Sequence, residues 1–418
     1  MRTVLYNYQI VDADTCLNGT VVIDDKIITD VISANSFNYA QKIDSLSTGA
    51  CMVLNGNGLC LTSGFVDMHA HFREPGFSQK ETLESASLAA AAGGYTTVCC
   101  MANTKPPIDT MEAALTLRTR ACELELIDLY PVISITKKMQ GNKLSEFLQS
   151  VEKQKQITYM PLLLSEDGRD IADKELYRRA MRLASGLNIP LSCHCDLDGE
   201  DAATQRVIDI ARNTNCRLHI AHVSTKKAAG IVRREKAGIK ARGADDLSLT
   251  AEATPHHISL NDRLAKKLGA ETNGKVAPPL RAGRDRTAII EALKDGTIDV
   301  IATDHAPHTT FDKENGSPGF TGLETSFAVC NKVLAGENNF SLKQLSALMS
   351  ANPARILGLN DRGKIAKGMR ADITIIDLEK TWTVDSYNFK SRGKNTPYNG
   401  MLLTGKVLRT ISDGKIVY

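Results

Sequence analysis

The sequence predicts a (β/α)8 barrel of the TIM type, with a small β-sandwich domain formed from both chain ends. Through the middle of the chain, short apolar runs rich in β-branched residues alternate with longer amphipathic segments. Both ends carry short strand-like runs separated by turn residues. Polar side chains follow the apolar part of each central run, as at the active-site face of a barrel. We expect the barrel to span residues 59–360, and residues 1–58 and 361–418 to form the small domain.

Both ends of the chain have a sequence pattern typical of β-strands. Near the start, the runs VLYNYQIVD, GTVVIDDKIITDVI and CMVLNGNGLCL are punctuated by Asn-Gly and Asp-Asp turns. Near the end, KGMRADITIIDLEKTWTV and GKVLRTISDGKIVY alternate in the same way. This similarity predicts that strands from both ends pair within one domain.

Eight central runs have the length and composition of buried parallel strands. They are LTSGFVDMHAH, YTTVCCMANT, LIDLYPVISIT, YMPLLLSEDG, IPLSCHCD, RLHIAHVST, LSLTAEATPHH and DVIATDHAPH. The segments between them include KETLESASLAAAAGG, MEAALTLRTRACELE, DKELYRRAMRLASGL and TKKAAGIVRREKAG, which have a helical pattern. Eight strands that alternate with helices indicate a parallel sheet closed into a barrel.

Composition excludes several classes of protein. The 418 residues include 51 basic and 48 acidic ones, a net charge of +3, without a basic stripe for nucleic acid or an anionic membrane surface. The apolar runs are too short to span a membrane. Ten scattered cysteines fit a reducing compartment, and the N-terminus lacks a signal-peptide pattern. We therefore expect a cytoplasmic protein.

His69 and His71 end the first central run. Residues i and i+2 of a strand point to the same side, so both imidazoles can reach one metal ion. The alternative is a pair of histidines held by ordinary hydrogen bonds. His194 and His222 end two neighbouring runs, and adjacent parallel strands lie about 4.8 Å apart, so this pair can share a second ion. The alternative for either residue alone is a hydrogen-bonded core histidine.

Two aspartates complete the predicted cluster. Asp304 ends the last run, which barrel closure places beside the first run and its histidines. A carboxylate buried there needs a cationic partner, although a helix N-cap is an alternative reading. Asp167 ends the fourth run and faces the barrel mouth, where it can bridge two ions. The alternative is turn chemistry, because an Asp-Gly pair is a strong turn signal.

Four imidazoles and two carboxylates at one barrel face predict a metal site. This set suits zinc, and also manganese, cobalt or iron. We expect two ions.

The motifs in the chain resemble those of the type I bacterial dihydroorotases, within the amidohydrolase superfamily. HAHFREPG together with TDHAPH is specific, and the others occur in the family's order over nearly the whole chain. They are GFVDMHAHFREPG (64–76), MANTKP (101–106), SEDG (165–168), SCHCD (192–196), HIAHVSTKKA (219–228), TAEATPHH (250–257), PPLR (278–281), IATDHAPHT (301–309), GLET (322–325), NPARILGL (352–359), GKIAKGMRADITIID (363–377) and KNTPYNG (394–400).

The resemblance implies roles for individual residues. It implies that His69, His71 and Asp304 bind one metal ion, His194 and His222 bind the other, and Asp167 bridges them. Many relatives, including hydantoinases, have a carboxylated lysine in the bridging position. The residues implied to contact substrate are His71, Arg73, Asn103, His308 and the backbone near Gly319. Arg73 and Asn103 match residues that hold a substrate carboxylate, and Asp304 would be the catalytic acid and base.

The implied reaction is the reversible, metal-dependent hydrolysis of the cyclic amide of (S)-dihydroorotate to N-carbamoyl-L-aspartate, the third step of de novo pyrimidine (UMP) biosynthesis. The resemblance also implies two zinc ions per subunit, a homodimer, and an association with aspartate carbamoyltransferase in some members. The alternatives are another cyclic amidohydrolase, such as a dihydropyrimidinase or allantoinase, or an inactive partner of the transferase. The inactive partners usually lose metal ligands, whereas this chain retains all six.

The chain departs from the family pattern in three places, one of which is MANT where the usual motif is MPNT, although Asn103 is retained. Ala277 precedes PPLR where the family commonly has an asparagine that contacts substrate. The segment between His194 and His222 is shorter than in typical type I members. None of these departures alters the predicted metal ligands.

Overall fold

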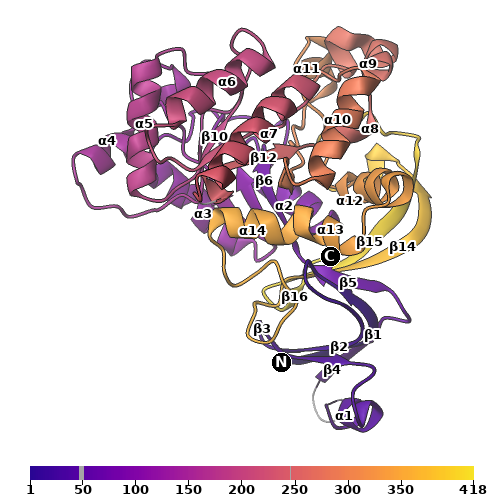
Figure 1. The fold of residues 1–418 in the computed structure, drawn as a ribbon. Coiled ribbons are helices and arrows are strands. Elements are labelled where there is room, and N and C mark those ends of the chain that lie inside the picture. Colours follow the sequence, from indigo (N-terminus) through magenta and orange to yellow (C-terminus); the bar gives the residue numbers. More distant parts are fainter. Residues whose placement is uncertain (47–50, 245) are drawn as a thin grey trace.

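A computed structural model describes residues 1–46, 51–244 and 246–418. Figure 1 shows helices packed around a group of central strands, with strands from both chain ends gathered at one side. The fold class predicted from the sequence is therefore confirmed: a barrel of alternating strands and helices, and a β-sheet that both ends of the chain build. No helix in the described ranges is long and apolar enough to cross a membrane.

Eight short parallel strands form the barrel wall, one for each predicted run. They are β6 (Phe65–Ala70), β7 (Tyr95–Cys100), β8 (Asp128–Pro131), β9 (Leu164–Ser165), β10 (Leu191–Cys193), β11 (Leu218–Ile220), β12 (Leu249–Ala253) and β13 (Val300–Ile301). Backbone hydrogen bonds of 2.9 Å from Asp304 N to His69 O and 2.8 Å from His71 N to His305 O join the last strand to the first. A parallel bridge between Ile133 and Leu164 joins β8 to β9, so the wall is continuous.

Helices follow the strands and cover the barrel. The longer ones are α2 (Leu83–Ala92), α3 (Met111–Glu123), α5 (Lys174–Gly186), α6 (Glu200–Ala211), α7 (Lys226–Ala241) and α10 (Gly283–Lys294). The shorter ones are α4 (Glu146–Glu152), α8 (Pro255–Ser259), α9 (Asp262–Leu268), α11 (Thr310–Glu314), α12 (Ser326–Cys330), α13 (Leu342–Ser346) and α14 (Asn352–Leu357). Four of the longer helices begin at the side-chain caps Thr82, Thr110, Asp173 and Thr225, each of which accepts a hydrogen bond from the first turn. These four are the helices predicted from sequence.

The strands of the two chain ends form one sheet in the order β16-β15-β14-β5-β1-β2-β3, with β4 paired to β1. Their bounds are β1 (Arg2–Val11), β2 (Cys16–Asp24), β3 (Ile27–Ser33), β4 (Cys51–Asn55), β5 (Cys60–Ser63), β14 (Ile373–Thr383), β15 (Leu402–Ser412) and β16 (Lys415–Ile416). The antiparallel pairing of β14 with β5 joins the two ends. A further helix, α1 (Tyr39–Leu46), follows β3. The domain limits at residues 58 and 361 remain predictions.

The predicted site residues lie at one end of the barrel. His69 is within β6 and His71 follows it, while His194 comes directly after β10. Asp167, His222 and Asp304 follow β9, β11 and β13 within three residues. Because all eight strands run parallel, these positions meet at the carboxyl-terminal mouth, which is the face that carries the active site in this fold.

Candidate metal centre

The barrel mouth brings together all six residues that were predicted to bind metal. All six side chains are buried. Two groups of three have ligand atoms within 4.8 Å of one another: His69, His71 and Asp167, and Asp167, His194 and His222. Asp167 belongs to both groups.

Asp167 and Asp304 contact the first histidine pair. Nε2 of His69 lies 3.2 Å from Asp167 Oδ1 and 3.7 Å from Asp304 Oδ1. Nε2 of His71 lies 3.5 Å from Asp167 Oδ2 and 3.1 Å from Asp304 Oδ1. Two imidazoles and two carboxylates therefore aim ligand atoms at the same small region.

The second pair faces the other side of Asp167. Nδ1 of His194 and Nε2 of His222 lie 2.9 Å apart, and 3.4 Å and 3.6 Å from Asp167 Oδ1. Among the described residues, Asp167 is thus the one carboxylate in contact with all four imidazoles, which is the position required of a residue that bridges two ions.

Two buried polar atoms of the cluster lack hydrogen bonds, and this bears on whether a metal ion fits here. Nε2 of His69 and Oδ1 of Asp167 are buried and form no hydrogen bond with any described residue, although they lie close together. Buried polar atoms are nearly always paired, so these two need a partner of another kind. Imidazole nitrogen and carboxylate oxygen are suitable ligands for zinc and for other divalent transition metals. The site therefore fits the predicted metal.

Electrostatics favour a cation at the same place. Burial alone would lower the pKa of His69, yet the carboxylates of Asp167 and Glu252 raise this pKa well above its usual value. Asp167 and His194 behave alike, because their contacts outweigh burial: the pKa of Asp167 lies well below its usual value, and that of His194 rises to about 10. Imidazoles that are stabilised as cations around an ionised carboxylate show that the cluster favours positive charge, which a metal ion would also supply.

Glu252, which the sequence reading did not single out, fixes the orientation of His69. Its Oε1 lies 2.7 Å from His69 Nδ1, so Nε2 of that ring is left to face the cluster. The same carboxylate accepts a hydrogen bond from His222 N and contacts His219 Nε2 at 3.0 Å. Carboxylates commonly orient metal-binding histidines in this way. A buried acidic residue in the middle of the run LSLTAEAT was the signal that could have identified it.

Asp196 orients His194 through a contact with one ring nitrogen, as Glu252 orients His69. Its Oδ2 lies 3.2 Å from His194 Nε2, which leaves Nδ1 directed at Asp167 and His222. The ring nitrogen that faces the cluster therefore differs between His194 and His69.

Three non-glycine residues of the mouth have left-handed backbone conformations. The φ angles are +62° at Arg73, +33° at His222 and +47° at Asp304. Such conformations are costly for residues with a Cβ atom and tend to persist at functional sites. They follow the strand ends, where the chain must turn sharply to bring these side chains to the cluster.

Arg73 and His308 lie side by side next to the cluster. Burial and the positive charges of Arg73 and Lys80 lower the pKa of His308 to about 2, so its ring is neutral. Its Nε2 donates to Pro318 O at 2.9 Å, and its Nδ1 accepts from Lys80 Nζ at 3.3 Å. The Arg73 Nη2 atom, 3.2 Å from that Nε2, therefore gains no acceptor from His308.

Arg73 has no carboxylate partner within the described parts of the chain. Nε of Arg73 donates to Pro307 O at 3.1 Å. Burial lowers the pKa of this guanidinium to about 10, which still leaves it charged. A partly buried guanidinium with free donors is a site for an anionic group.

The structure also places the last two predicted substrate contacts. Asn103 Oδ1 lies 2.9 Å from His71 Nδ1, so its carboxamide orients a candidate ligand. Gly319 adopts φ +134°, and a Cβ atom there would lie 2.5 Å from the Cβ of Ala306. Both residues are near the cluster, and their contact with substrate remains a prediction.

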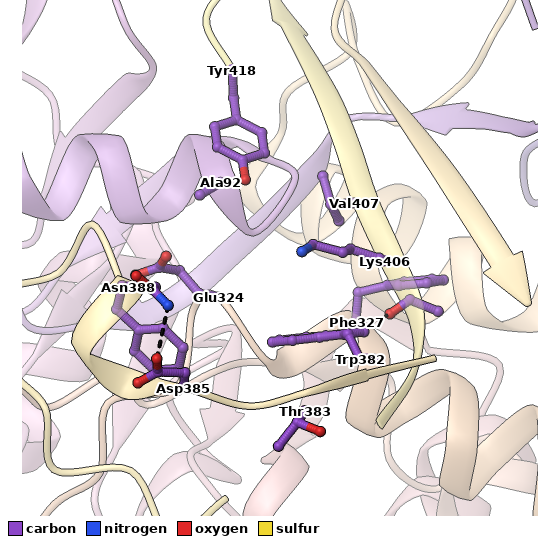
Figure 2. A pocket seen from close by; sticks show the side chains of 13 residues that line it. Ala92, Glu324, Phe327, Trp382, Thr383, Asp385, Asn388, Lys406, Val407 and Tyr418 are labelled. Carbon is purple, nitrogen blue, oxygen red and sulfur yellow. Dashed lines mark hydrogen bonds between the residues drawn. The ribbon is translucent and has the colours of Figure 1, made fainter. Parts of the chain in front are cut away.

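A separate cavity of about 150 Å³ lies between α12, β14 and β15 and contains none of the predicted site residues. In Figure 2, Glu324, Asp385 and Asn388 line one side, and Lys406 and Trp382 the other. Burial raises the pKa of Glu324 to about 7, and its carboxylate accepts hydrogen bonds from Lys390 N and Ser391 N. Glu324 therefore anchors the chain segment that leads to the barrel mouth.

Comparison with known proteins gives consistent results. A sequence model described as "Amidohydrolase family" matches residues 60–417. A dihydroorotase of Clostridium botulinum is 38% identical over 427 aligned positions, covering 100% of both chains. A dihydroorotase of Bacillus subtilis is 37% identical and covers 88% of this chain and 89% of its own.

Solved structures show the same fold at lower identity. The L-hydantoinase (dihydropyrimidinase) from Arthrobacter aurescens has a TM-score of 0.85 and 21% identity, covering 99% of this chain and 95% of its own. The dihydropyrimidinase from Brevibacillus agri has a TM-score of 0.82 and 20% identity, covering 100% and 95%.

We expect Glu252→Gln to lower metal affinity by about 10- to 100-fold, because the neutral amide no longer holds His69 as a carboxylate does. Metal content measured after dialysis against metal buffers would give the affinity. Glu324→Gln is the matched control, since it neutralises a buried carboxylate outside the cluster and should leave affinity unchanged. Equal affinity in Glu252→Gln and the unsubstituted protein would contradict the orienting role.

Proposed function

The chain belongs to the amidohydrolase family, and within it to the dihydroorotases, and we propose that it catalyses the reversible hydrolysis of (S)-dihydroorotate to N-carbamoyl-L-aspartate. In the forward direction, water adds to a ring carbonyl carbon and the ring C–N bond breaks. The single open-chain product carries a carboxylate at one end and a ureido group at the other. In the reverse direction the ring closes and water is lost.

The observation that carries the proposed substrate is the guanidinium of Arg73 beside the cluster, which has no carboxylate partner in the ranges of the chain that the structure describes. Dihydroorotate has a carboxylate next to its cyclic amide, and a guanidinium binds a carboxylate through two parallel hydrogen bonds. Hydantoin and dihydrouracil lack that carboxylate and would leave the Arg73 charge unpaired. Asp167 is a second difference from hydantoinases, because it occupies the position where they have a carboxylated lysine.

The residues proposed to hold two metal ions are His69, His71 and Asp304 for one ion and His194 and His222 for the other, with Asp167 shared. When bound, such ions polarise a carbonyl group and lower the pKa of water toward neutrality. Zinc is the proposed metal because imidazole and carboxylate ligands predominate.

Asp304 is the proposed acid and base. Burial alone would raise its pKa, but the imidazoles of His71 and His69 hold the pKa of Asp304 well below its usual value. The carboxylate is therefore ionised and able to accept a proton from the attacking water. Delivery of that proton to the leaving ring nitrogen returns Asp304 to its starting state.

Arg73, Asn103, His308 and the Gly319 backbone form the proposed substrate-binding side. Arg73 would bind the substrate carboxylate and thereby orient the ring toward Asp304. A homodimer, an association with aspartate carbamoyltransferase and a cytoplasmic location remain predictions.

Ring closure of N-carbamoyl-L-aspartate tests the proposed reaction directly. The purified protein, reconstituted with zinc, should form dihydroorotate, measured by ultraviolet absorbance, and a chelator should abolish the activity. Hydantoin and dihydrouracil, assayed alongside, should be poor substrates. Preferential hydrolysis of either would contradict the proposed substrate.

Asp304→Asn should lower kcat by about 10²- to 10⁴-fold, because the amide cannot accept and return the proton. The metal content of the variant must be measured in the same samples, since Asp304 is also a proposed ligand. A variant that retains its metal and nearly full activity would rule out the acid–base role.

Arg73→Ala should raise the KM for dihydroorotate by about 10- to 100-fold, because charge-assisted hydrogen bonds to the carboxylate are lost. Metal content should stay the same, and Arg73→Lys should recover part of the affinity. An unchanged KM would show that the carboxylate binds elsewhere.

A further inference from the structure

The loop Ser317–Phe320 forms one wall of the barrel mouth, and every carbonyl group in it accepts a hydrogen bond. Lys313 Nζ donates to Ser317 O at 2.9 Å and to Gly319 O at 3.0 Å. His308 Nε2 donates to Pro318 O, and Ala306 N donates to Phe320 O at 2.8 Å. Because four consecutive carbonyl groups of this loop accept hydrogen bonds, the loop is held in a fixed position.

Asn395, which lies far from the barrel strands in sequence, bonds to both this wall and His308. Its Oδ1 accepts from His308 N and from Thr321 Oγ1, both at 2.9 Å. Its Nδ2 donates to Ala306 O at 3.0 Å and to Gly319 O at 3.1 Å. These bonds use both donors and both lone pairs of the carboxamide.

The segment that carries Asn395 is itself anchored. Glu324, seen at the edge of the cavity in Figure 2, accepts hydrogen bonds from Lys390 N at 3.0 Å and Ser391 N at 3.1 Å. Glu81 accepts one from Arg392 N at 2.9 Å. Asn395 therefore projects from a segment that two carboxylates hold against the barrel, and its own backbone carbonyl accepts a hydrogen bond of 3.1 Å from Thr321 N.

The close packing around Gly319 leaves little room for the loop to move relative to Ala306 and His308. Besides the close approach to the Ala306 side chain, a Cβ atom there would lie 3.1 Å from Ala306 O and 3.4 Å from His308 Nε2. Asn395 bonds to the Gly319 carbonyl and the Ala306 carbonyl, so it joins the two segments in addition to the backbone bond from Ala306 N to Phe320 O. His308 and Asn395 also line an open cleft of about 530 Å³, which connects this region to solvent.

We propose that Asn395 is a positioning residue that fixes His308 and the Gly319 backbone on the substrate-binding side of the site. The proposal rests on the proposed function for the identity of the substrate. Because its carboxamide is fully occupied, Asn395 acts through these two neighbours. A displacement of about 1 Å at a binding group can cost about 100-fold in rate.

Asn395→Ala should lower kcat/KM by about 10- to 100-fold, chiefly through a higher KM for dihydroorotate. The factor should be the same in both directions of the reaction, because the substitution cannot change the overall equilibrium constant. Metal content should equal that of the unsubstituted protein. Asn399→Ala is the matched control: Asn399 lies in the same segment and cleft, and its side chain accepts from Ser386 N, whereas that of Asn395 bonds to His308 N and Gly319 O. It should leave both KM and kcat unchanged.

Asn395→Asp is the second variant, for use if the alanine variant does not fold. It keeps the volume and both acceptor contacts but places a carboxylate oxygen against the carbonyls of Ala306 and Gly319. We expect a loss of kcat/KM at least as large as in Asn395→Ala. A role confined to stability would instead lower Tm while leaving the KM of the folded protein unchanged, and that result would overturn the proposal.

Hydrogen exchange separates this proposal from the proposed function. Amides within residues 313–322 should exchange at least about tenfold faster in both variants than in the unsubstituted protein, whichever substrate the enzyme uses. Unchanged exchange in this segment would overturn the positioning role even in an active enzyme. Absence of dihydroorotate turnover in the unsubstituted protein, combined with faster exchange in the variants, would reject the substrate and retain the positioning role.

Discussion

Asp167 places one buried carboxylate in contact with four imidazoles at the mouth of the barrel. Asp304 and Glu252 are two further buried carboxylates that contact histidines of the same cluster. Burying charge without a partner is costly, and proximity of like charges adds to the cost. Positive charge within the cluster relieves both effects, so the arrangement of the surrounding groups follows from the need to hold a cation.

Barrel geometry explains how residues so distant in sequence meet. Strands β6, β9, β10, β11 and β13 each deliver a ligand-type side chain at the carboxyl end. Hydrogen bonds between β6 and the segment after β13 bring Asp304 to the histidines of the first strand. Outside the barrel, the segment of Asn395 reaches back across the mouth from between β14 and β15. The proposed substrate-binding side thus combines the barrel with a chain segment that follows it.

Periodicity and strand order were sufficient to predict from the sequence that the six proposed ligand side chains gather at the barrel mouth. His69 and His71 share a side because strand residues alternate, and Asp304 joins them because a barrel closes. Individual side-chain contacts were not predictable in this way. The contact between the Asn103 oxygen and His71 was not foreseen, and the contact of Asn103 with a substrate carboxylate remains a prediction. Glu252 was not identified because an acidic residue in the middle of a strand belongs to no recognisable motif. Asn395 was not identified because its hydrogen-bond partners lie about 75 to 90 positions away in the sequence.

Crystals of the zinc-reconstituted protein would test the central claim most directly through anomalous diffraction at the zinc edge. Two peaks per chain are expected, one beside His69 and His71 and the other beside His194 and His222, with Asp167 oxygens about 2.0–2.2 Å from both. A single peak, or two peaks that Asp167 does not join, would contradict the bridging role on which this account of the site depends.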